Sequence, residues 1–240
     1  MKNSNQILDE SSVERILKQL VSLETLGNDT KREYNNLLLK GDPKDLQHQI
    51  LLFSLARVCK YFDAYLVLAK SGYGEPSVNL LRSIFEASLW MRWILISKEN
   101  AERYFNASKG ESIRIAQVDI GRGLAKINKM LDPELIKKML ADEAKNNYLP
   151  DWKDLAKETG MGDLYALTYK FMSAMIHGTF LSLGERIIGQ KISPDPDYLN
   201  IEPFIPLANN LLRDCILVTK KWIEEKKIRE CPDIKALIAI

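Results

Sequence analysis

The sequence predicts an all-α protein, a helical bundle with a four-helix core and additional peripheral helices. Three observations support this prediction. Apolar residues recur at spacings of three and four over long stretches, no alternating strand pattern of useful length occurs, and prolines and glycines stand where helices would begin and end. Hydrophobic residues make up 46% of the chain, which is enough apolar surface for a sizeable core.

We expect a single domain over residues 1–240. N-terminal helices would occupy 1–41, the core bundle 42–190, and a loop, a C-terminal helix and a tail 191–240. Ser11 or Ser12 can cap the first helix, and Gly27-Asn28-Asp29-Thr30 is expected to break it. Its apolar face comprises Val13, Ile16, Leu17, Leu20 and Val21.

Two central helices follow, each apolar on several sides. Asp42-Pro43 predicts a helix start, with a capping carboxylate followed by proline at the first helical position. This helix is expected to end at the turn Gly72-Tyr73-Gly74. Pro76 opens the second central helix, which carries Arg82 and Glu86 in its middle.

Shorter helices and one long final helix are predicted for the rest of the chain. Asp151 is expected to cap a helix over 152–158 that Gly160 closes, and Pro206 stands in the first turn of the final helix. The apolar tail Ala236–Ile240 is expected to dock on the body or on a second copy. The other expected helical segments are Glu99–Lys109, Glu111–Met130, Glu134–Lys145 and Phe180–Ile188.

The bulk composition excludes several classes of protein. The net charge of +2 provides no global field that would recruit nucleic acid or a membrane, but 34 cationic and 32 anionic residues need not be evenly mixed, so a local basic patch stays open. Apolar runs are shorter than the roughly 18 residues that span a bilayer, and from the polar N-terminus we expect no signal peptide. Cys59, Cys215 and Cys231 are far apart, so reduced thiols in a cytoplasmic protein are expected.

Several standard sites are also excluded, because the chain has only two histidines, His48 and His177, and lacks the relevant motifs. There is no phosphate-binding P-loop, no His-Glu-x-x-His and no Glu-x-x-His pair, so neither a metal nor another cofactor is expected. We expect His48 on the surface or flank of its helix. The tryptophans Trp90, Trp93, Trp152 and Trp222 are expected in the core or at an interface.

The strongest candidate functional group lies on a helix that is expected to run from Tyr165 to His177 and to stop at Gly178. Ser173 and His177 are spaced i, i+4 and therefore share a face of this helix. The helix dipole favours a protonated imidazole at this end, and a histidine near neutrality can act as a general acid or base. The inner face comprises Tyr165, Thr168, Tyr169, Met172, Ser173 and Ile176.

Arg82 and Glu86 form the same i, i+4 pattern on the second central helix, among apolar neighbours. An ion pair in such a segment is costly unless it is fully hydrogen-bonded. Two interpretations remain open. The pair is structural and fixes helix register, or it belongs to a shared site in which His177 is the acid/base, Glu86 orients it and Arg82 binds an anionic group such as phosphate.

Two motifs that follow one another along the chain resemble those of a family of bacterial helical proteins, which is known only as a conserved domain of unknown function. The first is Leu-Leu-Arg-Ser-Ile-Phe-Glu-Ala at 80–87, and the second is Tyr165…Tyr169…Ser173…His177-Gly178. The resemblance covers roughly Tyr61 to Gly184.

More distantly, a helical bundle with a late helix ending in histidine is similar to the HEPN superfamily. That resemblance implies an RNA-cleaving toxin or phage-defence effector that works as a dimer. The HEPN motif places an arginine four to six residues before the histidine, whereas Lys170 stands seven residues before His177. Arg82 on the neighbouring helix is then the candidate guanidinium. The candidate catalytic residues are His177, Glu86 and Arg82, and the candidate substrate-binding residues are Tyr169, Ser173 and Lys170.

Three functional hypotheses follow. The first is an HEPN-like RNA-binding or RNA-cleaving effector that uses the Arg/Glu/His cluster. The second is a non-catalytic homodimeric interaction module, suggested by the apolar tail and the aromatic-rich helices. The third is a small-ligand sensor whose polar cluster forms the floor of a pocket.

Overall fold

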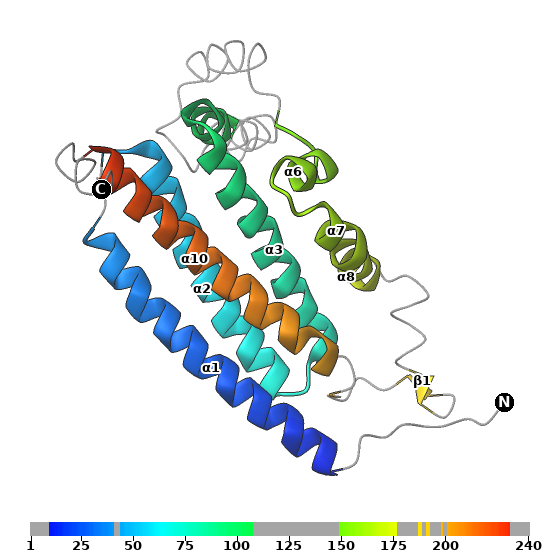
Figure 1. The fold of residues 1–240 in the computed structure, drawn as a ribbon. Helices are drawn as coiled ribbons and strands as arrows, with labels where there is room; N and C mark the ends of the chain where they lie inside the picture. Colours follow the sequence, from blue (N-terminus) through cyan, green and yellow to red (C-terminus); the bar gives the residue numbers. More distant parts are fainter. Residues whose placement is uncertain are drawn as a thin grey trace, which may run out of the picture.

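The computed structural model describes residues 10–40, 44–107, 149–176, 187–188, 191–192, 198 and 201–230. Four long helices lie side by side along most of their lengths (Figure 1). This arrangement confirms the predicted all-α helical bundle. The long helices are α1 (Glu10–Leu38), α2 (Leu46–Lys70), α3 (Gly74–Ile96) and α10 (Ile205–Glu230).

The final helix α10 packs against α1, α2 and α3 and so closes the bundle. It runs in the same direction as α1. Glu202, just before α10, forms an ion pair with Arg15 near the start of α1 at 3.0 Å, and Lys220 pairs with Glu33 near its end at 3.4 Å. Helix α2 runs in the opposite direction and packs against both of them (Figure 1).

One continuous hydrophobic core is formed by the four long helices, with contributions from the shorter ones. Burying one large apolar side chain stabilises a fold by about 1.5–3 kcal/mol, so these contacts dominate the stability. Trp93 is fully buried, and Trp90, Trp152 and Trp222 pack partly buried against the core, as predicted. The largest fully buried side chains are Trp93, Tyr65, Phe62, Phe85, Ile16 and Leu20.

The shorter helices pack on the side of α3 away from α1 (Figure 1). Residues 98–107 are helical. As predicted, Asp151 caps α6, since its side chain accepts hydrogen bonds from the backbone N–H groups of Lys153 and Asp154, and Gly160 follows with φ 73°. The segments that follow are α6 (Trp152–Glu158), α7 (Gly162–Leu164), the π-helical turn η2 (Tyr165–Tyr169) and α8 (Lys170–Ile176).

A short 3-10 turn and a small hairpin complete the described elements. The 3-10 turn η3 (Glu202–Phe204) leads into α10, in which Pro206 stands in the first turn as predicted. Strands β1 (Ile187–Ile188) and β2 (Lys191–Ile192) pair antiparallel. The segment 180–188, which was expected to be partly helical, therefore ends in a strand at Ile187–Ile188.

The expected break at Gly27–Thr30 is also wrong, because α1 continues without interruption from Glu10 to Leu38. A Cβ atom at Gly27 would lie 3.1 Å from Cε1 of the buried Phe62. The glycine is thus present because α1 approaches the Phe62 ring closely, and not because the helix ends there.

Two predictions about α2 are wrong. The helix begins at Leu46 with Asp45 as its N-cap, whose carboxylate accepts from the His48 backbone N–H at 2.9 Å; the expected cap, Asp42, lies outside the described residues. His48 is buried, with 3% of its surface exposed, and its ring stacks on Trp222 of α10 at 6.4 Å between centroids. The partner that buries His48 comes from the opposite end of the sequence.

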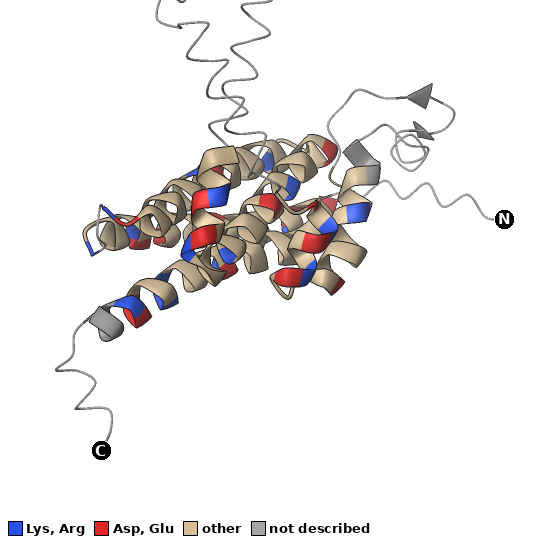
Figure 2. Ribbon diagram, turned by 90° about the horizontal axis from the view of Figure 1, so that it is seen from above, with Lys and Arg blue, Asp and Glu red and all other residues tan. Residues whose placement is uncertain are grey.

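Further expectations fall on residues outside the described ranges. They concern the helices over 111–130 and 134–145, residues 180–186, His177, Gly178, Cys231 and the tail 236–240. In the described helices, basic and acidic residues are intermixed over the surface (Figure 2). None of these helices is long and apolar enough to cross a membrane.

Candidate functional site

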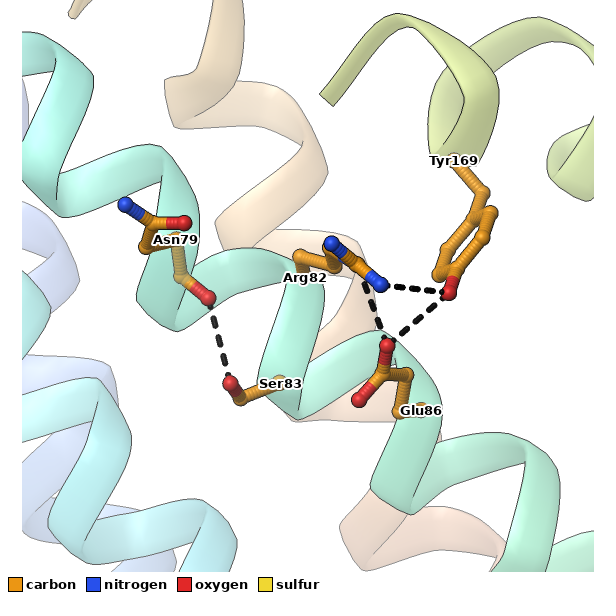
Figure 3. Close-up of polar contacts among 5 residues, drawn as sticks. All are labelled: Asn79, Arg82, Ser83, Glu86 and Tyr169. Carbon is orange, nitrogen blue, oxygen red and sulfur yellow. Dashed lines mark hydrogen bonds and ion pairs between the residues drawn. The ribbon is translucent and has the colours of Figure 1, made fainter. Parts of the chain in front are cut away.

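Arg82, Glu86 and Tyr169 form a closed triangle of hydrogen bonds between α3 and η2 (Figure 3). Arg82 Nε donates to Glu86 Oε1 at 3.0 Å, and Arg82 Nη2 donates to the Tyr169 hydroxyl oxygen at 2.9 Å. The Tyr169 hydroxyl in turn donates to Glu86 Oε1 at 3.0 Å. We call these three residues the polar cluster. It joins α3, the second central helix, to the π-helical turn that leads into α8, the helix on which Ser173 lies.

The polar cluster is only partly shielded from solvent. The side chains of Arg82 and Glu86 are 21% and 25% exposed, whereas Tyr169 is 5% exposed. Burial raises the pKa of the Tyr169 phenol above its ordinary value, although the adjacent guanidinium opposes that rise. Desolvation acts to lower the pKa of Arg82, but the bond to Tyr169 and the charge of Glu86 outweigh it and raise that pKa. The hydroxyl therefore stays a hydrogen-bond donor, and the guanidinium stays charged.

Two polar atoms of the cluster have no partner within the part of the chain that the structure describes. They are Nη1 of Arg82 and Oε2 of Glu86. One side of the guanidinium is thus fixed by Glu86 and Tyr169, while the other can bind an anionic oxygen. The second carboxylate oxygen can accept a hydrogen bond from a histidine or from a ligand.

The π-helical turn positions Tyr169. Residues 165–169 contain hydrogen bonds with i→i+5 spacing, including the bond from the Lys170 N–H to the Tyr165 carbonyl. Such turns are rare and occur frequently at functional sites. The ring of Tyr169 stacks on Tyr165 at 4.9 Å between centroids and contacts Phe85 of α3 at 5.7 Å. These ring contacts hold the phenol with its hydroxyl toward Arg82.

A groove lies beside the polar cluster, between α2, α3, α6 and the helix at 98–107, with a volume of about 230 Å³. We call it the aromatic groove, because Phe53, Trp90, Tyr104 and Trp152 line it. Trp90 contacts Tyr104 at 5.1 Å and Trp152 at 5.7 Å between ring centroids, so these three rings form one continuous wall.

The polar residues of the aromatic groove come from α2 and α3. Arg57 and Ser54 belong to α2, and Glu86 and Ser83 belong to α3. Glu86 is thus shared between the groove and the polar cluster. Ser83 bonds to the Asn79 carbonyl at 3.1 Å, on a different side of α3 from Arg82 (Figure 3). The groove is therefore lined by one cationic side chain, Arg57, and one anionic side chain, Glu86, and the rest of its wall is largely aromatic.

The structure brings together three of the six predicted site residues. Arg82, Glu86 and Tyr169 are in contact, whereas Ser173 is half-buried on α8 without a described bond to them, and Lys170 is exposed. His177 lies outside the described residues. Apart from Glu86, the polar groups of the groove were not predicted, although the spacing of Arg57 and Tyr61 on α2 repeats the i, i+4 pattern. Among the described side chains, no cluster of His, Cys, Asp and Glu could hold a metal ion.

The fold and the site define a helical-bundle protein with a mixed polar and aromatic site between its helices. This chain belongs to a family of unknown function, DUF5677, whose model matches residues 48–193. The match contains every residue of the polar cluster and of the aromatic groove, and it confirms the expected membership of a family of unknown function. No curated protein and no solved structure is detectably similar to this chain.

Proposed function

We propose that this protein is an HEPN-like RNA-binding and RNA-cleaving effector whose active site joins the polar cluster to His177. The observation that carries the proposal is the 2.9 Å hydrogen bond from Arg82 Nη2 to the Tyr169 hydroxyl. This bond holds a guanidinium against the segment that leads into Ser173 and His177. The HEPN motif puts its arginine on the same helix as the histidine, and here Arg82 takes that role from α3.

The roles of the residues follow from their chemistry. Arg82 binds a phosphate oxygen through Nη1, because Nε and Nη2 are already held by Glu86 and Tyr169. The His177 imidazole accepts the proton of a ribose 2′-hydroxyl, and Glu86 Oε2 orients the imidazole. The 2′-oxygen then attacks the adjacent phosphorus and the bond to the 5′-oxygen breaks, while water protonates that leaving oxygen. The products are a 2′,3′-cyclic phosphate and a 5′-hydroxyl end.

The test is incubation of the purified chain with tRNA and total RNA, with the ends of the fragments identified chemically. His177→Ala should lower cleavage by about 100-fold or more, the usual contribution of a general acid or base. Arg82→Lys should also lower cleavage, because lysine keeps the charge but loses the planar fork. RNA profiles that are identical for wild type, His177→Ala and buffer would refute the proposal.

The matched control is Arg92→Lys. Arg92 lies on the same helix, pairs with the carboxylate of Asp214 and has a similarly exposed side chain at 29%. It lies outside the polar cluster and the groove. Arg92→Lys should therefore lower stability about as much as Arg82→Lys does, while cleavage per folded molecule is retained.

The homodimer expected from the sequence also remains a prediction, which light scattering of the full chain would test. A second candidate function, a small-ligand sensor, is favoured by one observation, the aromatic groove that shares Glu86 with the polar cluster.

A further inference from the structure

We propose that the aromatic groove binds a single nucleobase that carries an exocyclic amino group, with the attached phosphate at Arg57. The inference rests on the proposed function in so far as RNA supplies the base. A free nucleotide presents the same chemistry, and the experiment below separates the two sources.

The aromatic walls supply the main attraction. Trp90 contacts both Tyr104 and Trp152, and Phe53 on α2 also lines the groove, although 70% of its surface is exposed. An exposed phenylalanine beside a wall of three rings offers a further aromatic surface to a planar heterocycle. Stacking on such rings is favourable for every nucleobase.

Glu86 supplies the selectivity among bases. Its Oε1 already accepts bonds from Arg82 and Tyr169, and its Oε2 has no described partner. An exocyclic amine, as in cytosine or adenine, can donate to one lone pair of Oε2, and the second lone pair is then left for the His177 imidazole of the proposed active site. Uracil has a carbonyl oxygen in the position where cytosine has this amine, and that oxygen would face the carboxylate unfavourably.

Arg57 supplies the anion contact. Its Nε donates to the Tyr61 hydroxyl at 2.8 Å, and its guanidinium carbon lies 5.1 Å from the centre of the Tyr61 ring. Within the described chain its terminal nitrogens donate no hydrogen bond, although burial raises the pKa of the nearby Tyr104 phenol and the Arg57 charge opposes that rise. The tyrosine therefore fixes the guanidinium while leaving its outer edge open to a phosphate.

The size of the groove limits the ligand. Its volume of about 230 Å³ lies below the roughly 300–1,000 Å³ of pockets that enclose a whole drug-sized molecule. One ring system fits inside, and the sugar and phosphate then remain at the mouth.

The test uses the full chain and follows the quenching of tryptophan fluorescence, since Trp90 and Trp152 line the groove, with titration calorimetry as a second readout. CMP should quench the fluorescence and bind about tenfold more tightly than UMP. Cytidine, which lacks the phosphate, should bind more weakly than CMP. A cytidine hexanucleotide that binds more tightly than CMP indicates RNA as the source of the base, whereas binding of CMP without a gain for the hexanucleotide indicates a free nucleotide.

Two exposed substitutions locate the binding. Phe53→Ala should weaken the binding of CMP by about tenfold through lost stacking, with Val67→Ala, an exposed apolar residue of the same helix, as its control. Arg57→Ala should weaken the binding of CMP but not of cytidine, with the exposed Lys60→Ala as its control. All four positions are exposed on α2, so the variants should fold, and thermal unfolding checks that they do.

The inference is overturned if no nucleotide or oligonucleotide binds at millimolar concentration, if CMP and UMP bind equally, or if neither Phe53→Ala nor Arg57→Ala changes binding. Its failure is distinguishable from that of the proposed function. Cleavage of RNA without any binding of CMP would reject the groove and retain the nuclease, whereas selective binding of CMP without cleavage would retain the groove and reject the nuclease.

Discussion

Arg92 of α3 and Asp214 of α10 are joined by two hydrogen bonds, one from each of two guanidinium nitrogens. The bond from Nε to Asp214 Oδ2 measures 3.1 Å, and Nη2 donates to Oδ1. Ser88 donates a third bond to Oδ2 at 3.3 Å. This carboxylate therefore anchors the final helix to the middle of the bundle.

Asp214→Ala should lower the free energy of unfolding by about 1–3 kcal/mol, because it leaves a half-buried guanidinium without its partner. Urea unfolding followed by circular dichroism measures the change. Glu14→Ala is the control, since the Lys18–Glu14 pair is solvent-exposed and contributes at most about 0.5 kcal/mol. Equal losses in both variants would show that Asp214 does not anchor α10.

Tyr169→Phe removes one hydroxyl and with it two of the three bonds in the polar cluster, while the ring contacts to Tyr165 and Phe85 remain. We expect a loss of about 1–2 kcal/mol in the free energy of unfolding, because both lost bonds involve charged partners. In the Glu86→Gln variant, Tyr169→Phe should lower the free energy of unfolding by less than it does in wild type. Additive losses in the double variant would mean that the two groups do not interact.

Gly27→Val should destabilise the protein by about 1–3 kcal/mol, the usual cost of adding atoms to a packed core. The first added carbon would already lie 3.1 Å from Phe62 Cε1, and Phe62 is buried. Gly162→Ala is the control, because nothing lies within 4 Å of its added carbon. A valine variant as stable as wild type would show that the α1–α2 contact can widen without cost.

Alkaline pH should destabilise the folded state partly through Cys59. Burial, followed by the nearby charge of Asp63, raises the pKa of this thiol to about 11. The unfolded thiol loses its proton at its ordinary pKa of about 9, so the unfolded state is favoured as pH rises from there towards 11. The contribution should be about 2 kcal/mol at pH 10.5.

The measurement for Cys59 is the difference in unfolding free energy between pH 7.5 and pH 10.5. This difference should be smaller in Cys59→Ala than in wild type, although Cys59→Ala is less stable at both pH values. Tyrosines with raised pKa, such as Tyr104, contribute equally in both proteins and cancel. The same pH-dependent loss in both proteins would refute the assignment to Cys59.

Local patterns predicted the fold and three side chains that the structure brings into contact, and the function of these side chains stays a prediction. The helix spacing identified Arg82 and Glu86 as a pair, and the periodicity of the later helix put Tyr169 on its inner face. Both predictions depend on neighbours three or four residues apart, which the sequence displays directly.

The failures concern contacts between segments that are distant in sequence. His48 is buried because Trp222, from the last helix, stacks on it, and Gly27 stays helical because Phe62 occupies the space beside it. The aromatic groove was missed for the same reason, because its walls come from four helices. The charge pattern and the periodicity of one helix do not indicate which other helix will pack against its apolar face.

The π-helical turn at Tyr165–Tyr169 has a consequence for the descent of this family. Such a turn holds one residue more than a regular helix, and each residue of a helix rotates the chain by about 100°. Regular winding of the same residues, with bonds of i→i+4 spacing, would turn Tyr169 and all that follows to another azimuth relative to Tyr165. Relatives that keep the phenol against the guanidinium at this chain length should therefore keep the wide turn as well.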